Sequence, residues 1–229
     1  MRLIDDSVFV VMDLDDTLYA ESDYQRSGFT HVAGLVAELF GVDVEPLLMT
    51  WHQAGDPDVF GTLAAYLGLH PRAKESFLWS YRLHRPAITL ADGAVDTVNK
   101  LKQACAGVAV LTDGRSITQR AKLAALGLTG IEAYISEEWG GADKPDGRRF
   151  NEIMSRNPGC EFFYVADNPA KDFLAPNNLG WTTIGVGDGH GETRTSGQGE
   201  HLPDAWIREF RQLGALIAPA NAVGRRGMP

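Results

Sequence analysis

Val8-Phe9-Val10-Val11-Met12-Asp13-Leu14-Asp15-Asp16-Thr17-Leu18 is the stretch of this chain that carries the most structural information. Its first five residues are apolar without alternation, which predicts a strand buried on both faces of a parallel sheet. Acidic residues follow at once, and ligand sites in open α/β sheets lie outside the carboxyl ends of the strands. Asp13 and Asp15 share a side if the strand continues, because side chains alternate along a strand. We therefore expect chemistry at the end of this strand.

Four more short apolar runs have the same character and are separated by helical patterns. They cover residues 108–111, 133–135, 162–165 and 181–184. Between them, Val95, Val98 and Leu101 recur at three-residue steps, and Gly127 stands where a helix C-terminus favours glycine. Strands that alternate with helices predict βαβ units with right-handed crossovers. The expected fold class is α/β, with a doubly wound parallel Rossmann-like sheet.

One long segment, residues 20–86, shows only helical periodicity and is expected to be an inserted all-helical cap. The expected helices cover residues 28–40, 44–53, 58–67 and 72–83, with glycine and proline between them. The core domain is then formed by residues 1–19 and 87–229. Within it, the glycine-rich residues 185–199 are expected to form a mobile surface loop, and the last residues from 224 a disordered tail.

Composition limits the class of protein. The chain has 229 residues, of which 44% are hydrophobic and 22% charged, as is usual for globular proteins. Its net charge of −9 argues against a nucleic-acid partner or an anionic membrane. No apolar run approaches the ~20 residues of a membrane span, and the N-terminus turns acidic before any signal peptide could form.

Cysteine usage points to a reducing compartment. Cys105 and Cys160 are the only cysteines, and they stand far apart in the sequence. This excludes a disulfide framework and a cysteine-based zinc site, and it favours a cytoplasmic protein. No feature of the sequence points to a particular oligomeric state.

The paired carboxylates of the first strand favour a metal. Two like charges held together are costly, and a bound cation is the usual reason to tolerate them. Oxygen ligands without a nearby histidine or cysteine favour Mg²⁺ over zinc. The alternative is a solvated acidic turn in which an aspartate caps a helix.

Polar residues follow the other predicted strands as well. Thr112-Asp113-Gly114 closes the second strand, Lys144-Pro145 follows the third, and residues 167–172 follow the fourth. Together with Asp13-Leu14-Asp15-Asp16-Thr17, these resemble the four motifs of the haloacid dehalogenase (HAD) superfamily. The helical insertion after the first motif is similar to that of members with a type C1 cap. The resemblance implies a Mg²⁺-dependent phosphatase for a small phosphorylated metabolite, such as a sugar phosphate or a nucleotide.

The resemblance also implies a role for each acidic residue. Asp13 would be the nucleophile that forms an aspartyl-phosphate. Asp15 would protonate the leaving oxygen and then activate water. Mg²⁺ would be held by Asp13, by the backbone carbonyl of Asp15 and by Asp167.

The remaining motif residues would bind the phosphoryl group. Thr112, Asp113 and Gly114 form the loop that would contact its oxygens, Thr112 through its side chain and Gly114 through its amide. Lys144 would add a positive charge, so that Thr112 and Lys144 also count as catalytic. Asp172 would support the metal site or Lys144 from the outer shell, without binding the metal directly.

Two alternatives to a phosphatase stay open. A phosphomutase would use the same residues, and a non-catalytic HAD-like binding module would keep the fold without the chemistry. Dehalogenase members of the superfamily lack an acid at the position of Asp15, because their leaving group needs no proton. The presence of Asp15 therefore favours a phosphoester substrate.

Overall fold

The computed structural model describes residues 7–187 and 199–217, and the chain divides into two compact units. The first consists of Met1–Ala20, Leu90–Ser116 and Thr129–Pro229. The second consists of Glu21–Thr89 and Ile117–Leu128, so it adds the latter segment to the helical block expected from the sequence.

A parallel sheet forms the centre of the first unit. Its strands are β1 (Val8–Met12), β2 (Gly107–Thr112), β3 (Glu132–Ile135), β4 (Glu161–Ala166), β5 (Thr182–Val186) and β6 (Ala205–Ile207). Their spatial order is β3-β2-β1-β4-β5-β6, and every neighbouring pair is parallel. The order reverses direction at β1, which confirms the doubly wound α/β fold predicted from the sequence.

The first strand lies in the middle because its residues are apolar on both sides. All five residues of β1 are buried, with Val10 beside Val108 of β2 on one side and Phe163 of β4 on the other. A strand with two partners and two covered faces favours apolar side chains along its length. The first polar residue, Asp13, therefore stands at the carboxyl edge of the sheet.

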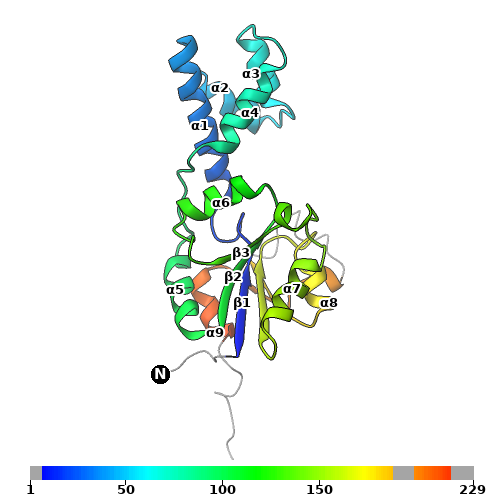
Figure 1. Cartoon of the computed structure of the whole chain (residues 1–229). Helices are drawn as coiled ribbons and strands as arrows, with labels where there is room; N and C mark the ends of the chain where they lie inside the picture. The colour runs from blue at the N-terminus through cyan, green and yellow to red at the C-terminus, as the bar shows by residue number, and fades with distance from the viewer. Residues whose placement is uncertain (1–6, 188–198, 218–229) are drawn as a thin grey trace, which may run out of the picture. The chain divides into compact units, whose positions relative to one another are not determined.

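Helices cover both faces of the sheet in this unit. They are α5 (Ala94–Ala104), α7 (Arg148–Arg156), α8 (Leu174–Asn178) and α9 (Leu213–Ile217), with short 3-10 helices η1 (Ser136–Trp139), η2 (Gly199–His201) and η3 (Phe210–Gln212). Figure 1 shows α5 and α9 on one side of the sheet and α7 and α8 on the other. Phe150 and Ile153 of α7 pack with Tyr164 and Trp181 in the core on the second side.

The edge strand β6 was not predicted from the sequence. Three residues are too few to show an apolar period, and tertiary packing decides their conformation. A Cβ atom on Gly185 of β5 would lie 2.4 Å from the ring of Trp206, so the glycine makes room for the β6 side chain. Most of the predicted glycine-rich loop (188–198) and the whole predicted tail lie outside the described residues.

The second unit is helical in its described residues. It contains α1 (Glu21–Phe40), α2 (Glu45–Gln53), α3 (Val59–Tyr66), α4 (Ala73–Leu83) and most of α6 (Ser116–Ala125). A buried apolar cluster that includes Phe29, Leu48, Leu63 and Phe77 joins α1 to α4. The four predicted helices of residues 20–86 are confirmed in position. Gly127 takes a left-handed conformation just past the end of α6, as expected for a helix C-terminus.

Helix α1 begins at Glu21, earlier than the predicted residue 28. The first two turns are mostly polar and show no apolar period. Acidic Glu21 and Asp23 stabilise the positive end of the helix dipole, and Tyr24 supplies a buried contact. The additional first turns of α1 are thus stabilised by the acidic residues at the helix start and by the buried contact of Tyr24.

Two predictions from the sequence, one on disulfides and one on membrane spans, can be compared with the described residues. Cys105 and Cys160 are both free. No helix in the described part of the chain combines the length and the apolar character needed to cross a bilayer.

Candidate active site

Asp13 continues β1 by one residue and lies in the interior. Its backbone N–H donates to the carbonyl of Val165 at 2.9 Å, and only 2% of Asp13 is exposed. The alternative of a solvated acidic turn is therefore wrong for this residue. A buried carboxylate needs a cationic partner or a proton.

Lys144 is that cationic partner. Its ammonium Nζ lies 2.8 Å from Asp13 Oδ1 and 2.7 Å from Asp172 Oδ1, and it donates to the Tyr164 hydroxyl at 3.2 Å. The Lys144 side chain is fully buried. The fold thus brings the first, third and fourth motifs of the sequence into direct contact.

The electrostatics of this cluster are set by burial and by an excess of carboxylates. The pKa of Asp13 is raised from 3.8 to about 7, chiefly by burial; the charge of Lys144 opposes this increase and the charge of Asp172 adds to it. Burial alone would lower the pKa of Lys144, but Asp13 and Asp172 outweigh it and hold that pKa well above its usual value. Lys144 therefore stays protonated, and Asp13 is the group that responds to an added proton or cation.

Three carboxylates form a group that suits a metal ion. Asp13, Asp167 and Asp172 each present one oxygen, and these oxygens lie within 4.8 Å of one another. Thr17 Oγ1 donates to Asp167 Oδ1 at 3.4 Å, and the Asn168 amide donates to Asp172 Oδ2 at 3.0 Å. The donor set contains only oxygen, which fits Mg²⁺.

Asp15 has a different environment from Asp13. Its carboxylate accepts a hydrogen bond from the Tyr19 hydroxyl, and Tyr19 is 1% exposed. Asp16 between them has a φ of 53°, a left-handed conformation that aspartate tolerates better than most residues. The Asp15 side chain is outside the three-carboxylate group, and ligation through its backbone carbonyl stays a prediction.

The second motif lies at the end of β2. Thr112 is its last residue and is 1% exposed. The Gly114 amide donates to Ser136 Oγ at 2.9 Å, so a phosphoryl oxygen would share or replace this bond. The Asp113 carboxylate accepts hydrogen bonds from Arg149 and from the Lys144 backbone amide. The predicted contact of Asp113 with substrate would therefore have to come from the Asp113 backbone.

Sequence reasoning missed three residues around these groups: Tyr19, Tyr164 and Arg149. Tyr164 belongs to the buried run of β4, where a tyrosine has no distinctive signal. Arg149 stands in a charged helix start beside Arg148, which has the pattern of a solvated face. Spacing offers a signal only for Tyr19, four residues after Asp15.

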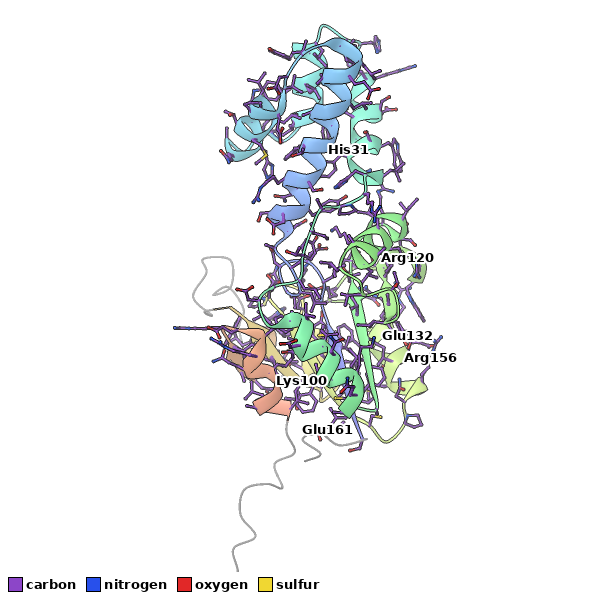
Figure 2. All side chains as sticks on the ribbon, turned by 90° about the vertical axis from the view of Figure 1, so that its left-hand side faces the viewer. His31, Lys100, Arg120, Glu132, Arg156 and Glu161 are labelled. Atoms are coloured by element: carbon purple, nitrogen blue, oxygen red, sulfur yellow. The ribbon has the colours of Figure 1, made fainter. Side chains whose placement is uncertain are left out.

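The opposite edge of the sheet carries ordinary surface pairs. Glu132, the first residue of β3, lies beside Arg156 near the end of α7 (Figure 2), at 3.2 Å, and both side chains are about half exposed. Solvent screening makes such a pair weak. By contrast, the charged side chains of Asp13, Lys144 and Asp172 at the carboxyl edge are buried.

The family model that matches this chain is described as haloacid dehalogenase-like hydrolase, and it matches residues 10–186. The match covers most of the chain and includes all four motifs. The chain belongs to this hydrolase family.

A phosphatase is similar to this chain over most of its length. Ribulose-1,5-bisphosphate 5-phosphatase of Halopiger xanaduensis is 27% identical over 200 residues, covering 76% of this chain and 82% of that protein.

Two solved HAD structures share the fold. The HAD-hydrolase YfnB from Bacillus subtilis, bound to magnesium, has a TM-score of 0.59 and 19% identity, over 92% of this chain and 98% of that one. The 2-haloacid dehalogenase of Pseudomonas syringae has a TM-score of 0.61 and 21% identity, over 92% and 97%. At this identity the two structures support the fold and leave the choice of reaction to the site residues.

Proposed function

We propose that this HAD hydrolase is a Mg²⁺-dependent phosphatase that hydrolyses a small phosphorylated metabolite through an aspartyl-phosphate. The observation that carries the proposal is the buried Asp13 carboxylate, ion-paired with Lys144, with a second, separately held carboxylate on Asp15. A carboxylate nucleophile with a proton donor nearby suits phosphoester hydrolysis through a covalent intermediate. The name of the Halopiger relative supports a phosphorylated substrate.

In the first step an Asp13 carboxylate oxygen attacks phosphorus and the bond from phosphorus to the leaving oxygen breaks. Asp15, in its protonated form, gives its proton to that oxygen. We assign the proton to Oδ2, because Oδ1 accepts from Tyr19. Lys144 remains protonated and offsets the negative charge gathered around Asp13.

In the second step Asp15 takes a proton from water, and the water oxygen attacks the same phosphorus. The bond between phosphorus and Asp13 breaks, which releases inorganic phosphate and restores the carboxylate. Thr112 and the Gly114 amide would hold the phosphoryl oxygens during both steps.

Asp13 and Asp167 would hold Mg²⁺, with Asp172 next to them. When bound, Mg²⁺ neutralises the repulsion between carboxylates and phosphate and orients the phosphoryl group. The magnesium bound to YfnB supports this choice of ion.

The dehalogenase among the similar structures makes a different reaction worth testing. A halide leaves as a stable anion and needs no proton, whereas an alkoxide does. Asp15, held by Tyr19 at the site, suits an oxygen leaving group. We therefore place phosphoester hydrolysis ahead of dehalogenation.

We further propose that residues 20–86 act as the cap that selects the metabolite. A cavity of about 530 Å³ in the helical unit is lined by residues that include Arg26, His31 and Arg85. Arg26 is paired with Asp23 at 3.2 Å, so Arg85 is the better candidate to attract an anionic part of the metabolite. Arg85→Ala should raise KM and leave kcat unchanged.

A screen of phosphorylated metabolites for phosphate release, with Mg²⁺ and with excess chelator, tests the proposal. A 2-haloacid is included as a competing substrate, and sugar phosphates are also checked for isomerised product. Phosphate release that needs Mg²⁺ supports the proposal. Halide release would favour a dehalogenase, isomerisation a phosphomutase, and no turnover by the Mg²⁺-loaded protein a binding module.

A further inference from the structure

Arg149 is a buried arginine at the start of α7 that the proposed steps do not use. It is 1% exposed. Its Nη1 donates to the carbonyls of Thr112 at 2.8 Å and Tyr134 at 3.2 Å. Its Nη2 donates to Asp113 Oδ1 at 2.5 Å and to the carbonyl of Ala142 at 3.3 Å. One planar guanidinium thus joins the end of β2, β3 and the loop that leads to Lys144.

Helix packing alone does not explain an arginine at this position. The neighbouring Phe150 and Ile153 of α7 are fully buried in the apolar core. Burying a guanidinium is costly, and an apolar side chain of similar volume often serves stability as well. Arginine is favoured where several acceptors in one plane must be held in fixed positions, because its five donors form a rigid fork.

The acceptors that Arg149 holds lead directly to the phosphate-binding residues. Thr112 is bound through its own carbonyl. Asp113 passes the contact on, since its two carboxylate oxygens each accept the Lys144 backbone N–H at 3.2 Å. The Lys144 ammonium then contacts Asp13. The path from the guanidinium to the proposed nucleophile consists of direct contacts.

The guanidinium also neutralises Asp113. Without it, the Asp113 carboxylate beside the phosphate-binding loop would lose the cation with which it forms an ion pair. Like charges repel, and water screens this repulsion less beside a protein than in bulk solvent. Arg149 therefore affects both the position of the loop and its charge.

We propose that Arg149 is a positioning residue of the phosphoryl site, which holds Thr112 directly and Lys144 through Asp113 before substrate binds. The inference rests on the proposed phosphatase function. It extends that function to a residue outside the four motifs.

The test compares Arg149→Met, Arg149→Lys and Asp113→Ala, alone and with Arg149→Met. We expect Arg149→Met to lower kcat/KM about 10²-fold, mainly through kcat, because small displacements of positioning groups have effects of that size. Arg149→Lys should recover part of the loss, since it restores the charge without the fork. The double variant should lose much less than the product of the two single losses, because both changes break one path.

Two matched controls lie on the same helix. Arg156→Met removes an exposed arginine that is paired with Glu152 and Glu132, and it should change kcat/KM less than about twofold. Ile153→Ala destabilises the core of α7 but keeps Arg149 and its acceptors. The two variants are assayed at temperatures equally far below their own midpoints of thermal unfolding. Under these conditions Arg149→Met should be far less active than Ile153→Ala. Equal activity of the two, or additive losses in the double variant, would overturn the proposal.

The outcome can be separated from failure of the proposed function. If wild-type protein releases no phosphate from any ester, the phosphatase proposal fails. A crystal structure of Arg149→Met still tests the positioning: the Lys144 amide should have left Asp113. An unchanged loop would overturn the inference, and if Arg149→Met does not fold, Arg149→Lys and Asp113→Ala answer the same question.

Discussion

Replacing Asp13 with asparagine should stabilise the metal-free protein above neutral pH while it abolishes turnover. The amide keeps the shape of the side chain and its acceptor for Lys144, but it cannot form a phosphoenzyme. Wild-type Asp13 is buried, and its pKa is raised from 3.8 to about 7. Between these values the folded state holds a proton that the unfolded state has lost, so wild-type stability falls as pH rises through this window.

The size of the effect follows from the shift. About three pH units at about 1.4 kcal/mol each give a free-energy difference of about 4 kcal/mol. Asp13→Asn does not titrate, so the difference in unfolding free energy between variant and wild type should be near zero at pH 4. It should rise to as much as about 4 kcal/mol by pH 8. Lys144 keeps Asp172 as a partner in the variant.

Hydrogen exchange of β1 peptides, measured in excess chelator from pH 5 to pH 8 and corrected for intrinsic exchange rates, reports the core unit specifically. This matters because a chain of two units need not unfold in one step. Asp16→Asn, an exposed change in the same turn, is the matched control variant. Added Mg²⁺ should stabilise wild type more than Asp13→Asn. A variant that is less stable than wild type at pH 8, or a difference that does not change with pH, would refute the reasoning.

Three other changes test neighbouring residues. Asp15→Asn should slow hydrolysis of an alkyl phosphate roughly 10²–10⁴-fold. With p-nitrophenyl phosphate it should give a burst of nearly one equivalent of nitrophenolate and then slow turnover, and equal slowing of both substrates without a burst would contradict the acid-base role. Tyr19→Phe should weaken alkyl phosphate turnover on the order of tenfold and aryl turnover less, because it removes one hydrogen bond to Asp15. Asp167→Ala should weaken Mg²⁺ binding in calorimetry by about 10-fold or more, and unchanged binding would remove it from the ligand set.

The sheet could be predicted because its strands are buried on both faces. Runs such as Val8–Met12 contain no polar residue, so their ends are marked by the first charge or glycine. The short strand β6 lacks such a run, and its place depends on Trp206 packing over Gly185. The early start of α1 depends on helix-end charges that have no period.

The site was predictable to the extent that its residues stand at strand ends. Asp13, Asp167 and Lys144 follow predicted strands, and parallel strands bring their carboxyl ends to one edge. Arg149 and Tyr164 come from a helix and from the middle of a strand. Their contacts with the site residues can be recognised only in the folded structure. In the sequence, a buried arginine has the same pattern as an exposed one.

Charge explains why these carboxylates remain at the edge of the sheet. Asp13 and Asp172 share Lys144, the charge of Lys171 also acts on Asp13, and Arg149 is already paired with Asp113. The group is therefore short of positive charge even before a phosphate arrives. A proton on Asp13 would correct this, but it would block the attack on phosphorus in the proposed mechanism. A divalent cation would correct the balance and leave the carboxylate ionised, so the features that make Asp13 costly to bury also favour the proposed Mg²⁺.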